Sequence, residues 1–368
     1  MDVTATVWTL LPPIIAIALA LITKEVYSSL MIGILSGALL YTGFHPLKAV
    51  ETTFTIMGSK LGDNINICIF LVLLGILVSL ITKSGASRAY GEWAVKTIRS
   101  RRGASFATSF LGMFIFVDDY FNCLTVGTVM RPVTDKYNIS RAKLAYIIDA
   151  TAAPVCIIAP ISSWAAAVGS SLPESSTLDG FSLFLKTIPL NLYALLTLAF
   201  LIWLMAADFD FGPMKKYELA HKDDDLSLIE ETHVVAGSGK VYDLILPISV
   251  LIVLCIAGML YTGGILEGAN IVEAFANCDS STALVLGSFF TLLFTFVLYI
   301  PRKVLSFGQF CEAFTEGFKA MVPAILILTL AWTLSGVCRE EYLNIGGFVS
   351  SVVKAESTIG MFMPAVFF

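Results

Sequence analysis

Apolar runs of about 20 residues recur along this chain, and that is the length a helix needs to cross the hydrocarbon core of a membrane. The first three such runs cover residues 3–23, 27–44 and 65–82. Charged residues make up 14% of the 368 residues and hydrophobic residues 57%, whereas a soluble domain carries roughly 25% charged residues. The sequence therefore predicts an all-α polytopic membrane protein.

The distribution of basic residues predicts how the chain is oriented. Lysine and arginine are concentrated between Lys83 and Arg102, and loops rich in these residues stay in the cytoplasm. Counting the earlier spans backwards places the N-terminus outside, in agreement with the absence of any basic residue before Lys24. That absence also argues against a cleaved signal peptide, so the first apolar run is expected to be a retained span.

Residues 103–171 differ from an ordinary pair of spans. The arm 104–117 would be only about 21 Å long as a helix, too short for a core of about 30 Å. Basic residues lie on both sides of segment 103–135, which predicts a re-entrant hairpin with Asp118 and Asp119 at its tip. The following run, 144–167, contains an aspartate and two prolines. Such features predict a broken helix beside a transport pathway.

The remaining chain suggests an internal repeat in the manner of secondary transporters. Residues 10–12 resemble 244–247, and residues 29–33 resemble 283–287 in the same order. We therefore expect a first transmembrane repeat over 1–207 and a second, inverted repeat over 241–368 that is cut short in a hairpin arm beginning at Thr358. The polar stretch 208–240 is predicted to be a poorly ordered cytoplasmic linker remote from the site. Its acidic run, 223–225, is interpreted as a solvated charge cluster, with a calcium site as the alternative.

Candidate ion-binding residues cluster in the hairpin and the broken helix. A dehydrated sodium ion needs several hard oxygen ligands, and carboxylates, hydroxyls and amides supply them. Two carboxylates that share a poorly solvated site do not ionise together readily, so one is expected to keep a proton near neutral pH. The predicted cation- and proton-binding residues are Asp118, Asp119, Asn122, Asp149, Thr151, Ser162 and Ser163, of which Asp118, Asp119 and Asp149 are the sodium-binding carboxylates.

Structural alternatives remain open for several of these residues. One aspartate of the tip pair could cap the second hairpin helix, and Asn122 could be an amide that packs the hairpin together. Asp135 is interpreted as a partner of Arg131 or Lys136. Arg131 itself could anchor the hairpin in the cytoplasm or bind an anionic substrate.

The motifs that carry the candidate residues also resemble those of a known family. The run from Val117 to Asn122, the run from Leu124 to Pro132, the segment Asp149–Pro154 and the segment Ala159–Trp164 are similar to those of NhaC-type sodium/proton antiporters of the ion-transporter superfamily. The resemblance implies a multi-pass carrier in the inner (plasma) membrane of a prokaryote. Related carriers often form homodimers that work by an elevator movement, and some exchange small carboxylates or amino acids.

The sequence features bear on three function classes. Sodium/proton antiport is favoured, with sodium ions and protons as transported substrates and the lipid bilayer as the surrounding medium. The alternative is a sodium- or proton-coupled transporter or exchanger of a small carboxylate or amino acid. An intramembrane enzyme is disfavoured because the chain lacks H-E-x-x-H and G-x-S-x-G motifs. No cofactor and no nucleic-acid partner are predicted.

Overall fold

The computed structural model describes residues 3–170, 180–220 and 237–355, and this part of the chain consists of helices and connecting loops. Five of its helices are long and apolar enough to cross a membrane, or six if one sharply bent pair counts as a single span. The protein is therefore an all-α polytopic membrane protein, as its apolar runs predict. The chain divides into two compact units, Met1–Ile65 with Val322–Phe368, and Asn66–Met321.

The smaller unit is built on a close pair of helices. Gly33 of α2 allows this approach, because a Cβ atom there would lie 2.7 Å from the Cβ of Ala16 in α1. Gly37 similarly abuts Val337, so the two glycines, four residues apart, form a small-residue packing face on α2. Helix α3 follows α2 at a bend of 117°. The described helices of this unit are η1 (Val7–Leu10), α1 (Leu11–Thr23), α2 (Val26–Tyr41), α3 (Pro46–Asp63), the second half of α16 (Phe307–Val337) and α17 (Ile345–Ala355).

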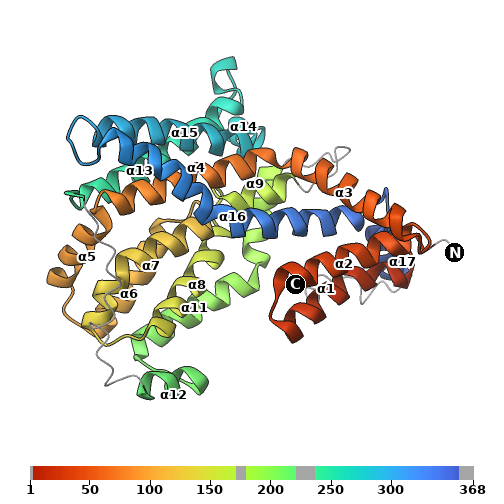
Figure 1. Ribbon diagram of the computed structural model, residues 1–368, viewed down its shortest axis with the longest axis horizontal. Helices are drawn as coiled ribbons and strands as arrows, with labels where there is room; N and C mark the ends of the chain where they lie inside the picture. The colour runs from red at the N-terminus through yellow and green to blue at the C-terminus, as the bar shows by residue number, and fades with distance from the viewer. Residues whose placement is uncertain (1–2, 171–179, 221–236, 356–368) are drawn as a thin grey trace. The chain divides into compact units, whose positions relative to one another are not determined.

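The larger unit holds the hairpin and the interrupted helix, and Figure 1 shows α6, α7, α8 and α11 side by side. In a second group of this unit, α13 packs against α15. A Cβ atom added to Gly287 of α15 would lie 2.6 Å from the Sγ atom of Cys255 in α13. The helices are α4 (Ile65–Lys83), α5 (Ala86–Thr97), α6 (Arg101–Phe114), α7 (Asp119–Lys136), α8 (Arg141–Cys156), α9 (Ser163–Ser170), α10 (Gly180–Thr187), η2 (Ile188–Leu190), α11 (Leu192–Ala207), α12 (Gly212–Ala220), α13 (Tyr242–Thr262), η4 (Ile265–Glu267), α14 (Ile271–Ala276), α15 (Ser280–Tyr299) and the first half of α16.

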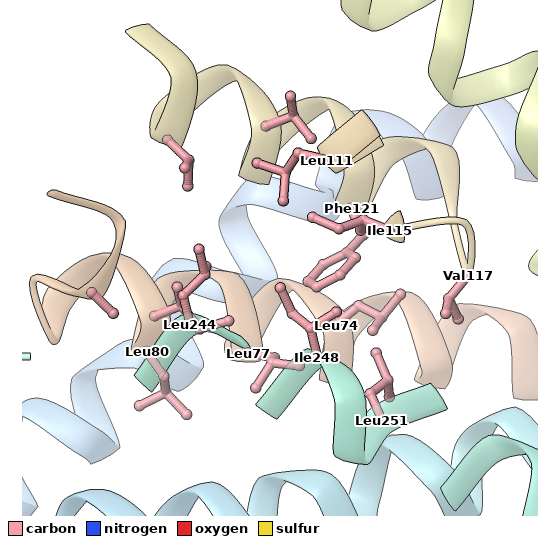
Figure 2. Close-up of a cluster of buried hydrophobic side chains, with 14 of the residues drawn as sticks. Leu74, Leu77, Leu80, Leu111, Ile115, Val117, Phe121, Leu244, Ile248 and Leu251 are labelled. Atoms are coloured by element: carbon pink, nitrogen blue, oxygen red, sulfur yellow. The ribbon is translucent and has the colours of Figure 1, made fainter. Parts of the chain in front are cut away.

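The tip of the hairpin is fixed by an apolar cluster. Ile115, Val117 and Phe121 are fully buried, and they face Leu74 and Ile248 of α4 and α13 (Figure 2). Burying a large apolar side chain contributes about 1.5–3 kcal/mol. The cluster therefore holds the turn between α6 and α7 in a fixed place, although polar groups lie directly beside it.

Some helix boundaries differ from those expected. The basic stretch 83–102, interpreted as a loop, contains α5, whose buried Ala86, Gly91 and Ala94 form a narrow packing face. The apolar run 184–207, long enough in the sequence for one span, is interrupted at η2 by Pro189, because proline lacks the N–H that continues the ladder of helical hydrogen bonds. The arm that begins at Thr358 lies outside the described residues. The expected inverted repeat stays a prediction.

Candidate functional site

Asn122 closes the hairpin from inside. Its Nδ2 donates to the carbonyl oxygens of Gly112 at 2.6 Å and Ile115 at 3.0 Å. Both carbonyls belong to the end of α6, where the last turn of a helix leaves its oxygens without intrahelical donors. The amide therefore packs the hairpin together, which is the structural alternative considered for this residue. Its oxygen takes no part in either of these hydrogen bonds.

Asp118 is the N-cap of α7. Its Oδ1 accepts a hydrogen bond from the backbone N–H of Phe121 at 2.9 Å, and the residue is 2% exposed. The Ser163 side chain is a hydrogen-bonding neighbour of the same carboxylate. Asp118 thus stabilises the tip, and it is the aspartate of the pair that fits the capping alternative.

Asp119 faces the interrupted helix. Its carboxylate has the Trp164 side chain as a hydrogen-bonding neighbour, and Asp149 is close enough for its charge to act on it. Asp149 is solvent-accessible on α8 and lines a groove of about 600 Å³, together with Cys123 of α7. Cys123 lies one turn beyond Asp119 in α7, so the groove runs from Asp149 along the helix that carries Asp119.

The interruption between α8 and α9 is held by a serine. The Ser162 hydroxyl shares its proton between the carbonyls of Cys156 at 2.7 Å and Ala159 at 2.9 Å, and its oxygen accepts from the Ala165 N–H at 3.2 Å. The Ser163 N–H donates to the carbonyl of Val117 in the hairpin tip at 2.9 Å. Ser162 therefore supports the break, whereas Ser163 connects it to the hairpin.

Thr151 lies deeper, at the contact of α8 with α6. Its hydroxyl donates to the Ile147 carbonyl at 2.7 Å, and its oxygen is 3.2 Å from the Ser109 hydroxyl. Ser109 is 2% exposed and was not among the residues singled out from the sequence. A serine in an apolar run does not by itself indicate a functional residue. Knowledge of which faces of α6 and α8 pack together would have identified Ser109 as the residue opposite Thr151.

The far end of the groove is basic. Arg131 and Arg141 line it, and Asp135 accepts a hydrogen bond from Arg141 Nη2 at 2.9 Å. Asp135 therefore has Arg141 as an ion-pair partner that the sequence did not indicate, and its expected pairing with Arg131 or Lys136 stays a prediction. The turn after α7 brings the start of α8 back toward Asp135, and neighbour spacing within one helix could not reveal this.

The start of the polar stretch is bound to the same structure. Lys143 of α8 forms an ion pair with Asp210 at 2.8 Å. Glu218 of α12 pairs with Arg101 and accepts from the Ser140 N–H at 3.2 Å. The prediction of a poorly ordered segment was wrong for residues 208–220, because side chains, rather than an apolar face, attach this part to α6 and α8. Residues 221–236 lie outside the described residues.

Fold and site together define a class, namely a polytopic helical membrane protein in which an aspartate of an interrupted helix lines a groove. The model of the Na+/H+ antiporter family matches residues 165–368. An uncharacterized protein of Haemophilus influenzae is 35% identical over 100% of this chain and 73% of its own length. No solved structure matches the chain. The chain belongs to the Na+/H+ antiporter family, whose matched segment begins just after Ser163.

Proposed function

We propose that the protein exchanges sodium ions for protons, with Asp119 and Asp149 as the carboxylates that bind them. The observation that carries this proposal is that Asp149 lines an open groove and is close enough to Asp119, on a separate element, for their charges to interact. The family match supports antiport of cations and protons. The NhaC subtype, the prokaryotic inner membrane, the external N-terminus and a homodimer remain expectations from the sequence.

The chemistry follows from like charges. Two carboxylates that lie close together repel each other unless a proton or a metal cation lies between them. A sodium ion that binds there removes the need for the proton, and a proton that binds weakens the hold on sodium. Each ion therefore displaces the other, and displacement at a site that opens alternately to the two sides produces exchange.

A second candidate is transport of a small carboxylate or amino acid. Arg131 and Arg141 line the groove that contains Asp149. The Nη1 atom of Arg141 is buried and has no hydrogen-bond partner among the described residues. A guanidinium group with a spare donor is suited to a carboxylate ligand.

Proteoliposomes containing the full-length protein separate the two candidates. With an imposed sodium gradient and a pH-sensitive dye inside, antiport moves protons against the sodium flow with no organic solute present. In a parallel arm, labelled small carboxylates and amino acids are offered with the same gradient. Proton movement that requires an organic solute, or solute uptake without direct sodium/proton exchange, would favour the second candidate and contradict the first.

A further inference from the structure

Three buried side chains at the contact of α6, α7 and α8 have already used every hydrogen-bond donor they possess. Both N–H groups of Asn122 are directed to the carbonyls of Gly112 and Ile115. The Thr151 hydroxyl proton is directed to Ile147. The Ser109 hydroxyl, 3.2 Å from the Thr151 oxygen, is then the donor of that pair. The polar capacity left at this contact consists of oxygen lone pairs.

One of these oxygens stands out. Asn122 Oδ1 is buried and accepts no hydrogen bond from the described residues, and the residue is 0% exposed. A Cβ atom added to Gly112 would lie 3.4 Å from this oxygen and 3.0 Å from Thr151 Cγ2. The amide oxygen and Thr151 therefore border the same bare face of α6, between the hairpin and α8.

An unsatisfied buried acceptor costs about 1–3 kcal/mol, so a ligand that offers positive charge is favoured there. An anion is repelled by oxygen lone pairs, and no donor remains among the three side chains to hold one. Uncharged amide and hydroxyl oxygens are hard ligands. A divalent ion requires carboxylates in addition, whereas a monovalent ion such as sodium does not.

We infer that Asn122 Oδ1 and the hydroxyl oxygens of Ser109 and Thr151 form an uncharged sodium subsite inside the contact between the hairpin and α8. It supplies uncharged oxygen ligands to the dehydrated sodium ion, in addition to Asp119 and Asp149, at which sodium and the proton displace each other. This inference rests on the proposed sodium/proton exchange, and it adds Ser109 as a ligand.

The test uses Ser109→Ala, which removes one oxygen without disturbing the Asn122 bonds that close the hairpin. Loss of one charge-assisted contact predicts a rise of at least about tenfold in the sodium KM. At saturating sodium the maximal rate should fall by a smaller factor, and the pH profile should keep its midpoint. Thr108→Val is the matched control, because the neighbouring Thr108 hydroxyl is also buried but bonds only to Ala104 of its own helix at 2.8 Å. The control should keep the wild-type sodium KM.

Direct binding separates failure of the subsite from failure of the proposed function. The detergent-solubilised full chain is heated in sodium chloride or choline chloride, and the sodium concentration for half-maximal thermal stabilisation is measured. If wild type exchanges no sodium for protons but Ser109→Ala shifts this midpoint about tenfold, the subsite stands and antiport fails. If Ser109→Ala keeps the wild-type midpoint and KM, or loses stability equally in both salts, the subsite is wrong.

Discussion

The N–H of Ser163 donates to the carbonyl oxygen of Val117 at 2.9 Å, so the first residue of α9 is bonded to the turn of a hairpin that precedes it by some 45 residues in the sequence. This bond crosses from one interrupted element to another. Trp164, the next residue, is a neighbour of Asp119. The positions of the tip carboxylates and of the break in the helix are therefore set together.

Removing the titrating charge of Asp149 tests the carboxylate pair. Asp149→Asn keeps the shape and hydrogen-bonding groups of the side chain, and we expect it to abolish sodium-dependent proton exchange while expression is retained. Asp119→Asn should do the same. Dye-monitored exchange in proteoliposomes measures both variants. Asp135→Asn is the control, because Asp135 pairs with Arg141 at 2.9 Å, and its effect should be much milder. Wild-type rates and pH profiles in Asp149→Asn would refute the assignment.

Asp118 should act through the stability of the tip. Asp118→Ala removes the cap from α7 and leaves the Phe121 N–H buried without its acceptor, which is expected to cost about 1–2 kcal/mol. Asp118→Asn retains a capping oxygen and should lie near wild type. Apparent melting temperatures in detergent compare the two variants. Equal losses from both substitutions would mean that the charge of Asp118, not its cap, stabilises the fold.

The ion pairs of the 208–220 segment should contribute to stability. The side chains of Lys143 and Asp210 are only 10% and 15% exposed. Asp210→Asn leaves the nearly buried ammonium group of Lys143 without its counter-charge, which should lower the free energy of unfolding by about 2 kcal/mol or more. Asp208→Asn is the matched control, since Asp208 and Arg102 are 3.9 Å apart and their side chains are 31% and 59% exposed. That exposed pair should contribute about 0.5 kcal/mol or less. The apparent melting temperature distinguishes them, and equal effects would contradict the prediction.

The crossing of α4 and α16 depends on two glycines. A Cβ at Gly75 would lie 2.3 Å from the carbonyl oxygen of Gly317, and backbone must move to admit it. We expect Gly75→Ala to destabilise the larger unit by about 1–3 kcal/mol. Gly58→Ala in α3 provides the comparison, because a Cβ there meets nothing within 4 Å. It should stabilise its helix by up to about 1 kcal/mol. The apparent melting temperatures of both variants are compared with wild type. A shift of the same sign in both would contradict this prediction.

The sequence predicted the span over 65–82 well, because apolar runs of that length have few other uses, whereas the helices in the runs 3–23 and 27–44 are shorter than the expected spans. It also predicted a two-armed element around Asp118 and Asp119, since charges in an apolar setting demand a special structure. Its failures concern residues whose role depends on partners far along the chain. The position of Ser109 becomes informative only when its contact with Thr151 is known. Arg141 contacts Asp135 only because the turn after α7 brings the two residues together. Ion pairs that attach α12 leave no periodic pattern, so charge density alone suggested disorder.

The units found in the structure also differ in kind from the repeats expected from the sequence. Compact units depend on which helices pack together, and α16 passes from one unit to the other near Met321. Repeats depend on ancestry and are detected by matched motifs. The matched glycines nonetheless have similar surroundings, since Gly33 abuts Ala16 and Gly287 abuts Cys255. The matched motifs therefore mark glycines at which two helices pack closely. They do not indicate where the compact units begin and end.

The serine in the break has a consequence for movement. Ser162 binds the Cys156 and Ala159 carbonyls that the interrupted helix releases, and Ala165 in turn binds Ser162. These exchanges are completed within ten residues of one segment. If this region moves during a transport cycle together with the hairpin tip, to which Ser163 bonds it, these hydrogen-bond partners move with it. The Cys156 and Ala159 carbonyls then require neither lipid headgroups nor water molecules, and the barrier to the movement loses the contribution that these two carbonyls would add if they were exposed to hydrocarbon.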